Sequence, residues 1–455
     1  MNAGWQGSTT VLADYEEAPF RPFHLRVAVS STSGVFSDGF GLGIIGISLS
    51  AASSPLQLSP SWLGSIGAAS LAGLFAGALL TGPVADRFGR RPLFAWNMAV
   101  LAVLSLAQWL VGTAWELLLL RLAIGFVLGT DYVVSKALLT EFSPRRVRGR
   151  VLSTLSIAWA AGYVCAYVVG YSLTDSGPAA WRWMLVSSAI PPLLILPLRL
   201  SIPESPMWLT QQGFPARALK VVQDHIGDDV AAPVRSAASR RGWRWHQLLS
   251  RPWRRHTAVG CVFFTCQVIP YFAVGTFITE VIAHLSTQRG YLGGLAYNLA
   301  LLGGSLAGRL IVDWISRRAF LLGSFAITGV TMLTLSAWTG LPDAAVVVLL
   351  AVFACVLSAQ STLVYVYLPE LFPTELRASG IGLAVACSRL GSAASTFLLP
   401  VVVATFGVRT ALGACVGTLV FGLIVCLLWA PETKSLSLGS LERPPGKADL
   451  STHRA

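Results

Sequence analysis

The sequence predicts an all-α polytopic membrane protein in which twelve transmembrane helices form two pseudo-symmetric bundles of six. Three observations lead to this prediction: a composition poor in charge, twelve long apolar runs, and a set of polar motifs that occurs twice. The chain has 455 residues, of which 54% are hydrophobic and only 12% are charged. Soluble domains carry about 25% charged residues. The composition therefore excludes a soluble enzyme, a disordered protein and a nucleic-acid binder.

Twelve apolar runs are each long enough to cross a bilayer, whose hydrocarbon core needs about 20 helical residues. The runs are interrupted by clusters of charge and by Gly, Pro, Asp or Asn. They are continuous and do not alternate in the way barrel strands do, so we expect helices. The predicted spans are residues 27–50, 62–82, 93–112, 116–140, 151–173, 181–201, 257–283, 291–312, 320–340, 343–367, 378–404 and 408–430.

The positions of Lys and Arg predict which ends of the spans face the cytoplasm, because cytoplasmic loops carry an excess of both. Of the 33 Lys and Arg, three lie on the opposite side (Arg182, Arg289, Arg409) and three lie within spans (Arg121, Lys136, Arg389). The others lie at the termini, after even-numbered spans or within the last turn of one (Arg199 and Arg309). We therefore expect a cytoplasmic N-terminal tail (1–26), a six-helix bundle (27–202), a cytoplasmic linker (203–256), a second bundle (257–430) and a cytoplasmic tail (431–455). The net charge of +12 then reflects topology in a cell membrane, plasma or inner, and not nucleic-acid binding.

Three polar motifs occur twice at nearly the same offset, which indicates an internal duplication. The first copies are Asp86–Arg91, Glu141–Pro144 with Arg148, and Pro203–Ser205. The second copies follow 227, 229 and 228 positions later: Asp313–Arg318, Glu370–Pro373 with Arg377, and Pro431–Thr433. Each copy falls after the second, fourth or sixth span of its half. The chain therefore reads as two six-helix halves joined by the linker.

These motifs resemble those of the major facilitator superfamily. Residues 82–91, Gly-Pro-Val-Ala-Asp-Arg-Phe-Gly-Arg-Arg, match its signature between the second and third helices. Residues 203–209, Pro-Glu-Ser-Pro-Met-Trp-Leu, look like the sugar-porter-type signature after helix six, and residues 431–434 look like its counterpart after helix twelve. The resemblance is to the sugar-porter-like or metabolite:proton symporter branch. It implies the major facilitator fold and transport by alternating access.

The repeated charges predict a latch at the cytoplasmic helix ends, because carboxylates favour helix N-termini and cations favour C-termini. The resemblance implies that the latch stabilises one of the alternating-access states; the alternative is a loop with solvated charges. The second copy has Trp314 in place of Arg87 and Ser316 in place of Gly89, and Arg309 stands where a glycine is expected, which argues against a latch there. The candidate latch residues are Asp86, Arg90, Arg91, Glu141, Arg148, Glu204, Asp313, Arg317, Arg318, Glu370, Arg377 and Glu432.

Ionisable side chains inside spans indicate function, because each costs about 2.5–3.5 kcal/mol or more at the bilayer centre. Asp38 in the first span and Asp131 in the fourth are candidate proton carriers, since a carboxylate exposed to each side in turn can load and release a proton. A structural ion pair inside the bundle is the alternative. Arg121 lies where proton-coupled relatives often carry an arginine, so the resemblance makes it a candidate tuner of Asp38.

Two cations inside spans are candidates for binding an anionic substrate. Arg389 is the first choice because its planar guanidinium pairs with carboxylate or phosphate, and Lys136 is the second. Residues 129–135 look like the helix-four signature of phosphate and organic-anion symporters. Polar side chains that recur on predicted helices five, seven and ten are further candidates for the cavity lining, with packing as the alternative: Tyr163, Tyr167, Gln267, Tyr271, Gln360 and Tyr365.

Taken together, the residues predict a secondary transporter that carries a small organic anion or related metabolite, as a proton symporter. One alternative is proton-driven efflux of a drug-like or secondary-metabolite compound, although predicted helix five lacks the Gly-Pro element of drug antiporters. A sugar porter is another, although Gln267 stands without the paired glutamine of hexose porters. A transporter-like receptor without flux is a third. We expect no enzymatic activity, cofactor or metal site, and a monomer whose partners are its substrate, the proton and the lipid bilayer.

Overall fold

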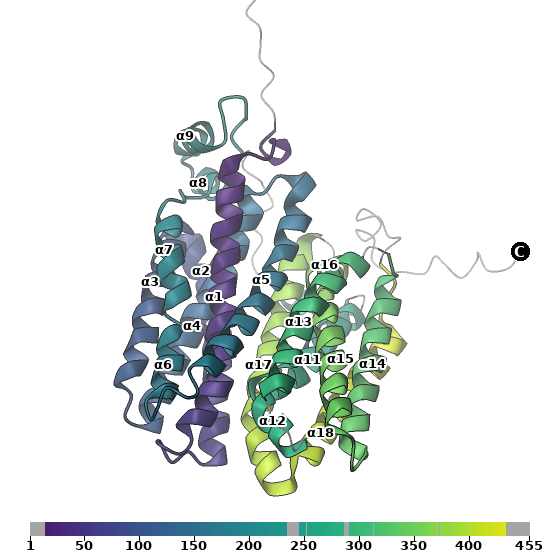
Figure 1. Ribbon diagram of the computed structural model, residues 1–455. Coiled ribbons are helices and arrows are strands. Elements are labelled where there is room, and N and C mark those ends of the chain that lie inside the picture. The colour runs from purple at the N-terminus through teal and green to yellow at the C-terminus, as the bar shows by residue number, and fades with distance from the viewer. Residues whose placement is uncertain are drawn as a thin grey trace, which may run out of the picture.

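The computed structural model describes residues 14–233, 245–251, 253–285, 291–312, 314–372 and 374–433. Its long elements are helices, and they form two groups that stand side by side (Figure 1). The first group contains α1 to α7 and the second contains α11 to α18. Helices α8 and α9 lie at one end of the first group (Figure 1), and we call this end of the molecule the linker end. This architecture confirms the predicted all-α fold of two helical bundles.

The first half contains the six predicted spans in order: α1 (Pro22–Ala52), α2 (Pro60–Phe88), α3 (Arg91–Ala107), α4 (Ala114–Phe142), α5 (Arg145–Ser172), and α6 (Ala180–Ser187) with α7 (Ile190–Leu200). Side-chain caps fix where some of these helices begin. The Thr113 hydroxyl accepts from the backbone N–H of Glu116, whose carboxylate accepts from that of Thr113 in return. Proline in the first turn of α7 has no N–H to donate, so the sixth span is divided into two helices.

The second half repeats this order with two further interruptions. Its helices are α11 (Arg254–Thr276) with α12 (Ile278–Leu285), α13 (Tyr291–Ile311), α14 (Arg317–Ala337), α15 (Asp343–Gln360) with α16 (Leu363–Glu370), α17 (Thr374–Phe406) and α18 (Val408–Trp429). The short helices α8 (Pro206–Gln211), α9 (Pro215–His225) and α10 (Trp245–Leu248) lie between the halves in sequence. Within the described residues, eleven helical stretches are long and apolar enough to cross a membrane. Helix α13 occupies the eighth predicted span and is not among the eleven.

The outside of the bundle is apolar, as a membrane-spanning protein requires. Large apolar side chains project from the helices into the surroundings; Leu110 is 82% exposed and Phe406 is 72% exposed. An apolar surface of this extent would be an aggregation hazard in water. The buried core, in contrast, contains most of the polar and charged side chains found within the spans. The polar groups of the spans therefore face inward, where a functional site has to be sought.

Close backbone contacts hold the helices of each half together, as is usual where lipid removes the hydrophobic drive for helix association. Helices α1 and α5 approach most closely at Gly39 and Gly162. A Cβ on Gly162 would lie 2.8 Å from the backbone nitrogen of Phe40 and still closer to the carbonyl oxygen of Phe36. A Cβ on Gly39 would meet the carbonyl of Trp159 in the same way. Both positions require glycine because backbone, not a flexible side chain, occupies the space.

We expect Gly162→Ala to lower the stability of the protein by about 1–3 kcal/mol, the usual cost of overpacking. The matched control is Gly149→Ala in the same helix, where an added Cβ meets nothing within 4 Å. That change should be neutral or stabilising by up to about 1 kcal/mol, because alanine favours helix. The thermal unfolding midpoints of the detergent-purified variants test this. Equal midpoints would show that α1 and α5 are not in close contact.

Candidate functional site

A cavity lies between the two halves. Helices α1, α4 and α5 of the first half line it together with α11, α15, α16 and α17 of the second half. Its walls are largely aromatic. The Trp159 ring of the first half lies 5.4 Å from the Tyr271 ring and 6.0 Å from the Phe272 ring of the second half, measured between centroids. Both halves therefore contribute to one cavity, as a substrate site at the interface of two repeats requires.

Two cations line this cavity, Lys136 on α4 and Arg389 on α17. Both lie against aromatic rings. The Nζ of Lys136 lies 3.5 Å from the ring centroid of Tyr132 and 4.7 Å from that of Tyr365. The Cζ of Arg389 lies 5.4 Å from the Tyr132 centroid and 5.9 Å from the Phe272 centroid. Cation–π contact stabilises such charges, and none of the described residues that line the cavity is an Asp or Glu.

A buried ion pair lies within the first half. Asp131 on α4 and Arg199 on α7 are both 0% exposed, and the guanidinium binds the carboxylate through two nitrogens. Nη1 of Arg199 donates to Oδ1 of Asp131, and Nη2 donates to Oδ2 at 3.0 Å. Ser135 and Asn97 donate to the same carboxylate, at 3.0 Å and 3.4 Å. For Asp131, the structure therefore shows the alternative that the sequence left open, a structural ion pair.

Asp38 is the second buried carboxylate, on α1, and is 3% exposed. Its Oδ1 has no hydrogen-bond partner among the described residues. It lies one turn after Gly34, where an added Cβ would collide with Nη2 of Arg199 and lie 2.8 Å from Oδ2 of Asp131. It also lies three residues after Val35, which lines the cavity. Asp38 therefore lies within about one helical turn of residues at the ion pair and at the cavity, and Asp131, Arg199, Arg389 and Lys136 act on it electrostatically.

The structure gives Arg121 different surroundings from those we predicted. Its Nη2 donates to the carbonyl oxygen of Gly41 at 2.8 Å, and its charge acts on Tyr163. Among the described residues, Oδ1 of Asp38 has no hydrogen-bond partner, so Arg121 does not donate to it. Arg121 reaches α1 three residues after Asp38, where a backbone carbonyl and not the carboxylate binds its guanidinium. The cations that act on Asp38 are Arg199 on α7, Arg389 on α17 and Lys136 on α4.

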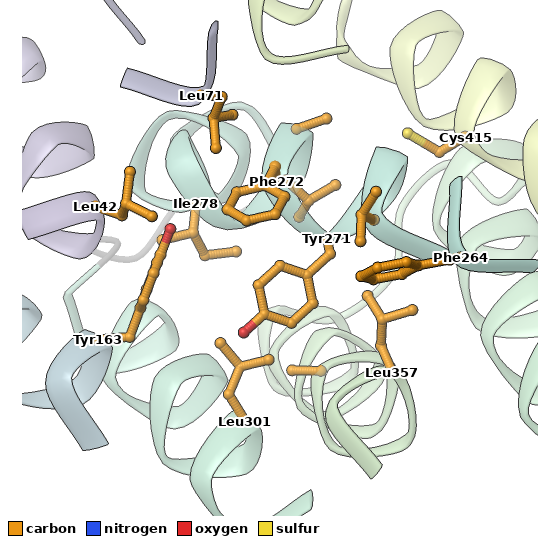
Figure 2. Packing of buried hydrophobic residues seen from close by; sticks show 14 of the residues in the cluster. Leu42, Leu71, Tyr163, Phe264, Tyr271, Phe272, Ile278, Leu301, Leu357 and Cys415 are labelled. Carbon is orange, nitrogen blue, oxygen red and sulfur yellow. The ribbon is translucent and has the colours of Figure 1, made fainter. Parts of the chain in front are cut away.

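The polar side chains predicted to line the cavity divide into two sets. Tyr271 and Tyr365 line it, whereas Tyr163, Tyr167, Gln267 and Gln360 do not. Tyr163 of the first half and Tyr271 of the second belong to one packed cluster (Figure 2). The Tyr167 hydroxyl lies against Gly294 of α13. Gln267 donates to the carbonyl of Leu357 at 3.2 Å and to the Ser361 hydroxyl at 2.6 Å, next to the interruption between α15 and α16.

The linker end carries the predicted latch residues, and the same contact occurs in both halves. The carboxylate of Glu204 accepts from the backbone N–H groups of Arg90 and Arg91 at 3.0 Å and 3.1 Å, at the start of α3. The carboxylate of Glu432 accepts from those of Arg317 and Arg318 at 3.1 Å and 3.2 Å, at the start of α14. Each carboxylate thus satisfies the free N–H groups of a helix N-terminus.

Side-chain ion pairs surround each of these contacts. In the first half, Arg90 pairs with Asp86 at 3.1 Å and with Glu141 at 3.2 Å. In the second, Arg317 pairs with Glu370 at 3.7 Å. The second copy has the carboxylate contact although its sequence departs from the motif, because the contact uses backbone N–H groups and does not depend on the side chains at 314 and 316. Asp313 and the side chain of Arg377 lie outside the described residues.

The N-terminal segment packs onto the linker end of the first half. The Tyr15 hydroxyl donates to the carbonyl of Glu141 at 3.0 Å, and Arg148 pairs with Glu16 at 3.7 Å. Burial raises the pKa of the Tyr15 phenol above its ordinary value, so this group stays a neutral donor. Each of the ion pairs described at this end joins elements of one half. Latch contacts of this kind stiffen the halves individually.

One side chain at the linker end does connect the two halves. Arg309 on α13 donates through Nη1 to the carbonyl of Arg150 on α5 at 2.9 Å and also to the hydroxyl of Ser153. This is the arginine that stands where the superfamily resemblance implies glycine. Its length lets it reach across to the first turns of α5.

Three residues that shape the site were missed from the sequence. Arg199 lies within the predicted sixth span but next to its end, so we counted it with the cytoplasmic charges. Tyr132 is four residues from Lys136 and thus on the same helix face, a signal that was available. Trp159 gave no signal beyond its place in an apolar run. Among the described residues, no cluster of three or more His, Cys, Asp or Glu is arranged to hold a metal ion.

A helical bundle with a cavity shared by two repeated halves defines a membrane transporter. A family model described as sugar (and other) transporter matches residues 21–443, and the chain belongs to this family, a sugar-porter-like branch of the major facilitator superfamily. It is a multi-pass membrane transporter of the sugar and metabolite type and not an enzyme.

The chain is similar to curated and solved proteins over most of its length. The inner membrane metabolite transport protein YgcS of Escherichia coli (strain K12) is 38% identical over 425 residues, covering 93% of this chain and 95% of that protein. The putative metabolite transport protein YaaU of the same strain is 34% identical over 428 residues, covering 93% and 96%. The partially occluded inward-open structure of the xylose transporter XylE from E. coli superposes with a TM-score of 0.78 at 20% identity, covering 92% of this chain and 100% of that chain.

We expect Arg309→Ala to widen the linker end, because it removes hydrogen bonds between the halves. Spin labels on the linker-end turns of α5 and α13, with distances measured by pulsed electron resonance, test this. The matched control is Arg318→Ala, since Arg318 donates within its own half, to the carbonyl of Leu427 at 2.8 Å. The control should leave the distance distribution unchanged. An unchanged distribution for Arg309→Ala as well would mean that this contact does not hold the halves together.

Proposed function

We propose that the chain is a proton symporter for a small organic anion, working by alternating access. One observation carries the proposal: Lys136 and Arg389 both line the cavity between the halves, and no described lining residue is a carboxylate that would neutralise them. The buried carboxyl group of Asp38 is near enough to interact electrostatically with both. A negatively charged substrate would supply the counter-charge that Lys136 and Arg389 lack in the cavity lining.

An anion is favoured because of the cost of burying unpaired charge. A cation removed from water is stabilised by an opposite charge much more strongly than by neutral dipoles, since the local dielectric is low. The rings of Tyr132, Tyr365 and Phe272 hold the two cations in place but do not neutralise them. A carboxylate or phosphate that reaches Arg389 and Lys136 gains charge-assisted hydrogen bonds.

Proton coupling follows from the position of Asp38. When ionised, its carboxylate is the nearby negative charge for Lys136 and Arg389, and it competes with the substrate for them. Protonation of Asp38 removes this competition, so proton and anion each favour the binding of the other. Such mutual favouring is a coupling free energy between two sites. The same fold is used by XylE, which is described as a proton:xylose symporter.

The orientation that the Lys and Arg distribution predicts is part of the proposal. The linker end, with its repeated Arg and Glu contacts, then faces the cytoplasm together with both termini. The transporter acts as a monomer, since the cavity is complete within one chain. Export of an amphipathic compound and transport of a sugar are the alternative functions. The aromatic walls of the cavity suit either, whereas its two cations favour an anion.

A thermal-shift screen of the purified protein identifies the substrate class. The panel contains carboxylates, phosphate, neutral sugars and cationic drugs. Stabilisation by carboxylates or phosphate supports the proposal, whereas stabilisation by sugars or cationic drugs alone contradicts it. Counterflow in proteoliposomes with the best ligand then establishes transport.

We expect Asp38→Asn to abolish uptake driven by a pH gradient while expression and counterflow persist, because the amide cannot carry the proton. The matched control is Asp175→Asn, which removes an exposed carboxylate outside the spans. Uptake is measured in proteoliposomes with and without an imposed gradient. Gradient-driven accumulation by Asp38→Asn equal to that of the parent protein would remove Asp38 from the mechanism.

We expect Arg389→Gln to weaken binding of a carboxylate about 10- to 100-fold, the loss that corresponds to about 1.5–3 kcal/mol for a hydrogen bond to a charged group. Binding of the corresponding neutral amide should change little. Isothermal titration of the two ligands against both proteins measures the difference. Arg121→Gln, a buried arginine outside the cavity lining, is the control. An equal loss for acid and amide would assign Arg389 a structural role.

A further inference from the structure

We propose that Arg199 decides which of the two buried carboxyl groups carries the proton. Its ion pair keeps Asp131 ionised and leaves protonation to Asp38. Arg199 is therefore a positioning residue for proton coupling, and its role in transport rests on the function proposed above. The inference itself concerns where the proton resides in the protein, which can be measured without any substrate.

Both carboxylate oxygens of Asp131 accept hydrogen bonds from neighbouring side chains. Its Oδ1 accepts from Nη1 of Arg199 and from Asn97 at 3.4 Å. Its Oδ2 accepts from Nη2 of Arg199 at 3.0 Å and from Ser135 at 3.0 Å. Each oxygen thus has two donors, and the groups around it offer hydrogen atoms and not lone pairs. This environment suits a carboxylate and opposes a protonated acid.

Contacts with residues of other helices hold the guanidinium of Arg199 next to Asp131. Nη1 also donates to the carbonyl of Phe94 at 3.3 Å, and Nη2 to the hydroxyl of Ser135 at 3.1 Å. The guanidinium carbon lies 4.1 Å from the centroid of the Phe94 ring. On the opposite side it lies against Gly34 of α1, where any side chain would collide with it. Helices α1, α3 and α4 therefore fix the guanidinium of α7 in one place.

Asp38 differs from Asp131: it is also buried, but one of its oxygens has no hydrogen-bond partner among the described residues. The charged groups that face it come from three elements: Asp131 and Lys136 on α4, Arg199 on α7 and Arg389 on α17. Two carboxylates close together in a region of low dielectric do not both ionise without compensation. Because Arg199 compensates Asp131, the remaining carboxyl group is the one that takes up the proton.

Removal of Arg199 should therefore relocate the proton. Without the guanidinium, Asp131 becomes a buried carboxylate without a counter-ion and competes with Asp38 for protons. Asp38→Asn should therefore remove the titrating carboxyl group in the parent protein. In a protein without Arg199, the same change should leave a titrating carboxyl group, that of Asp131.

Infrared difference spectroscopy of the purified protein in lipid, titrated with protons alone, tests the inference through the C=O stretch of a protonated carboxylic acid. In the parent protein, we expect Asp38→Asn to remove the pH-dependent band and Asp131→Asn to leave it. In the Arg199→Gln background, we expect Asp38→Asn to leave a band and the further change Asp131→Asn to remove it. A band that Asp131→Asn removes from the parent protein would overturn the inference, as would the absence of any band in the double variant Asp38→Asn, Arg199→Gln.

Two further variants separate this role from a structural one. The pair Arg199→Gln with Asp131→Asn removes both charges, so no ion is left unpaired, and it should retain the Asp38 band in a folded protein. Its loss would overturn the inference. Arg121→Gln removes a buried arginine that donates to the carbonyl of Gly41, and it should leave the band assignment of the parent protein unchanged; a reassignment of the band to Asp131 there would also overturn the inference.

The outcomes distinguish the inference from the proposed function. If the parent protein shows the expected band pattern but no proton flux accompanies transport, the symport proposal fails and the role of Arg199 stands. If transport is coupled to protons and the band in the Arg199→Gln background still depends on Asp38 alone, the role of Arg199 fails and symport stands.

Discussion

The ion pair between Asp131 and Arg199 is the interaction on which the charges of the core depend. A buried charge without a partner costs several kcal/mol, about as much as a protein can tolerate. Neighbours from α3 and α4 donate hydrogen bonds to the carboxylate of the pair, and the guanidinium lies against α1 at Gly34. Because Arg199 is used in this way, its charge is not available to neutralise Asp38. The excess of cations at the cavity therefore rests on Lys136 and Arg389.

The two halves share their linker-end contacts but not their buried charges. Glu204 and Glu432 bind the first N–H groups of α3 and α14 in the same manner, because this contact stabilises a helix N-terminus wherever a span follows a tight turn. The ion pair and Asp38 belong to the first half alone, whereas the second half contributes Arg389. Duplication thus explains the helical framework that the halves share, and sequence differences between the halves explain the charged residues of the site.

The sequence predicted the fold well because a bilayer leaves few choices: long apolar runs must be helices, and repeated motifs define the halves. It predicted the contacts of the buried side chains less well. The position of a residue along a span gives its depth in the membrane but not the direction in which its side chain points. Arg121 was assigned to Asp38 on the strength of resemblance, yet it binds the carbonyl of Gly41. Arg199 was counted as a cytoplasmic charge because arginine at the end of an apolar run is usual there. Glu432 was a candidate latch residue, but its backbone partners at Arg317 and Arg318 were not foreseen, because backbone N–H groups leave no trace in a motif.

The distribution of charges between the halves also suggests how movement is linked to protonation. Asp38, Asp131, Arg199 and Lys136 all lie on helices of the first half, which close backbone contacts such as that of Gly39 with α5 hold together. When the halves rock as units in the proposed cycle, the spacing among these four groups persists. Arg389 lies on α17 of the second half, so it is the cation near Asp38 whose distance changes. An anion that bridges Lys136 and Arg389 would span the two halves, so its binding senses their relative position. Arg389, which moves relative to the first half, then links substrate binding, protonation and conformational state.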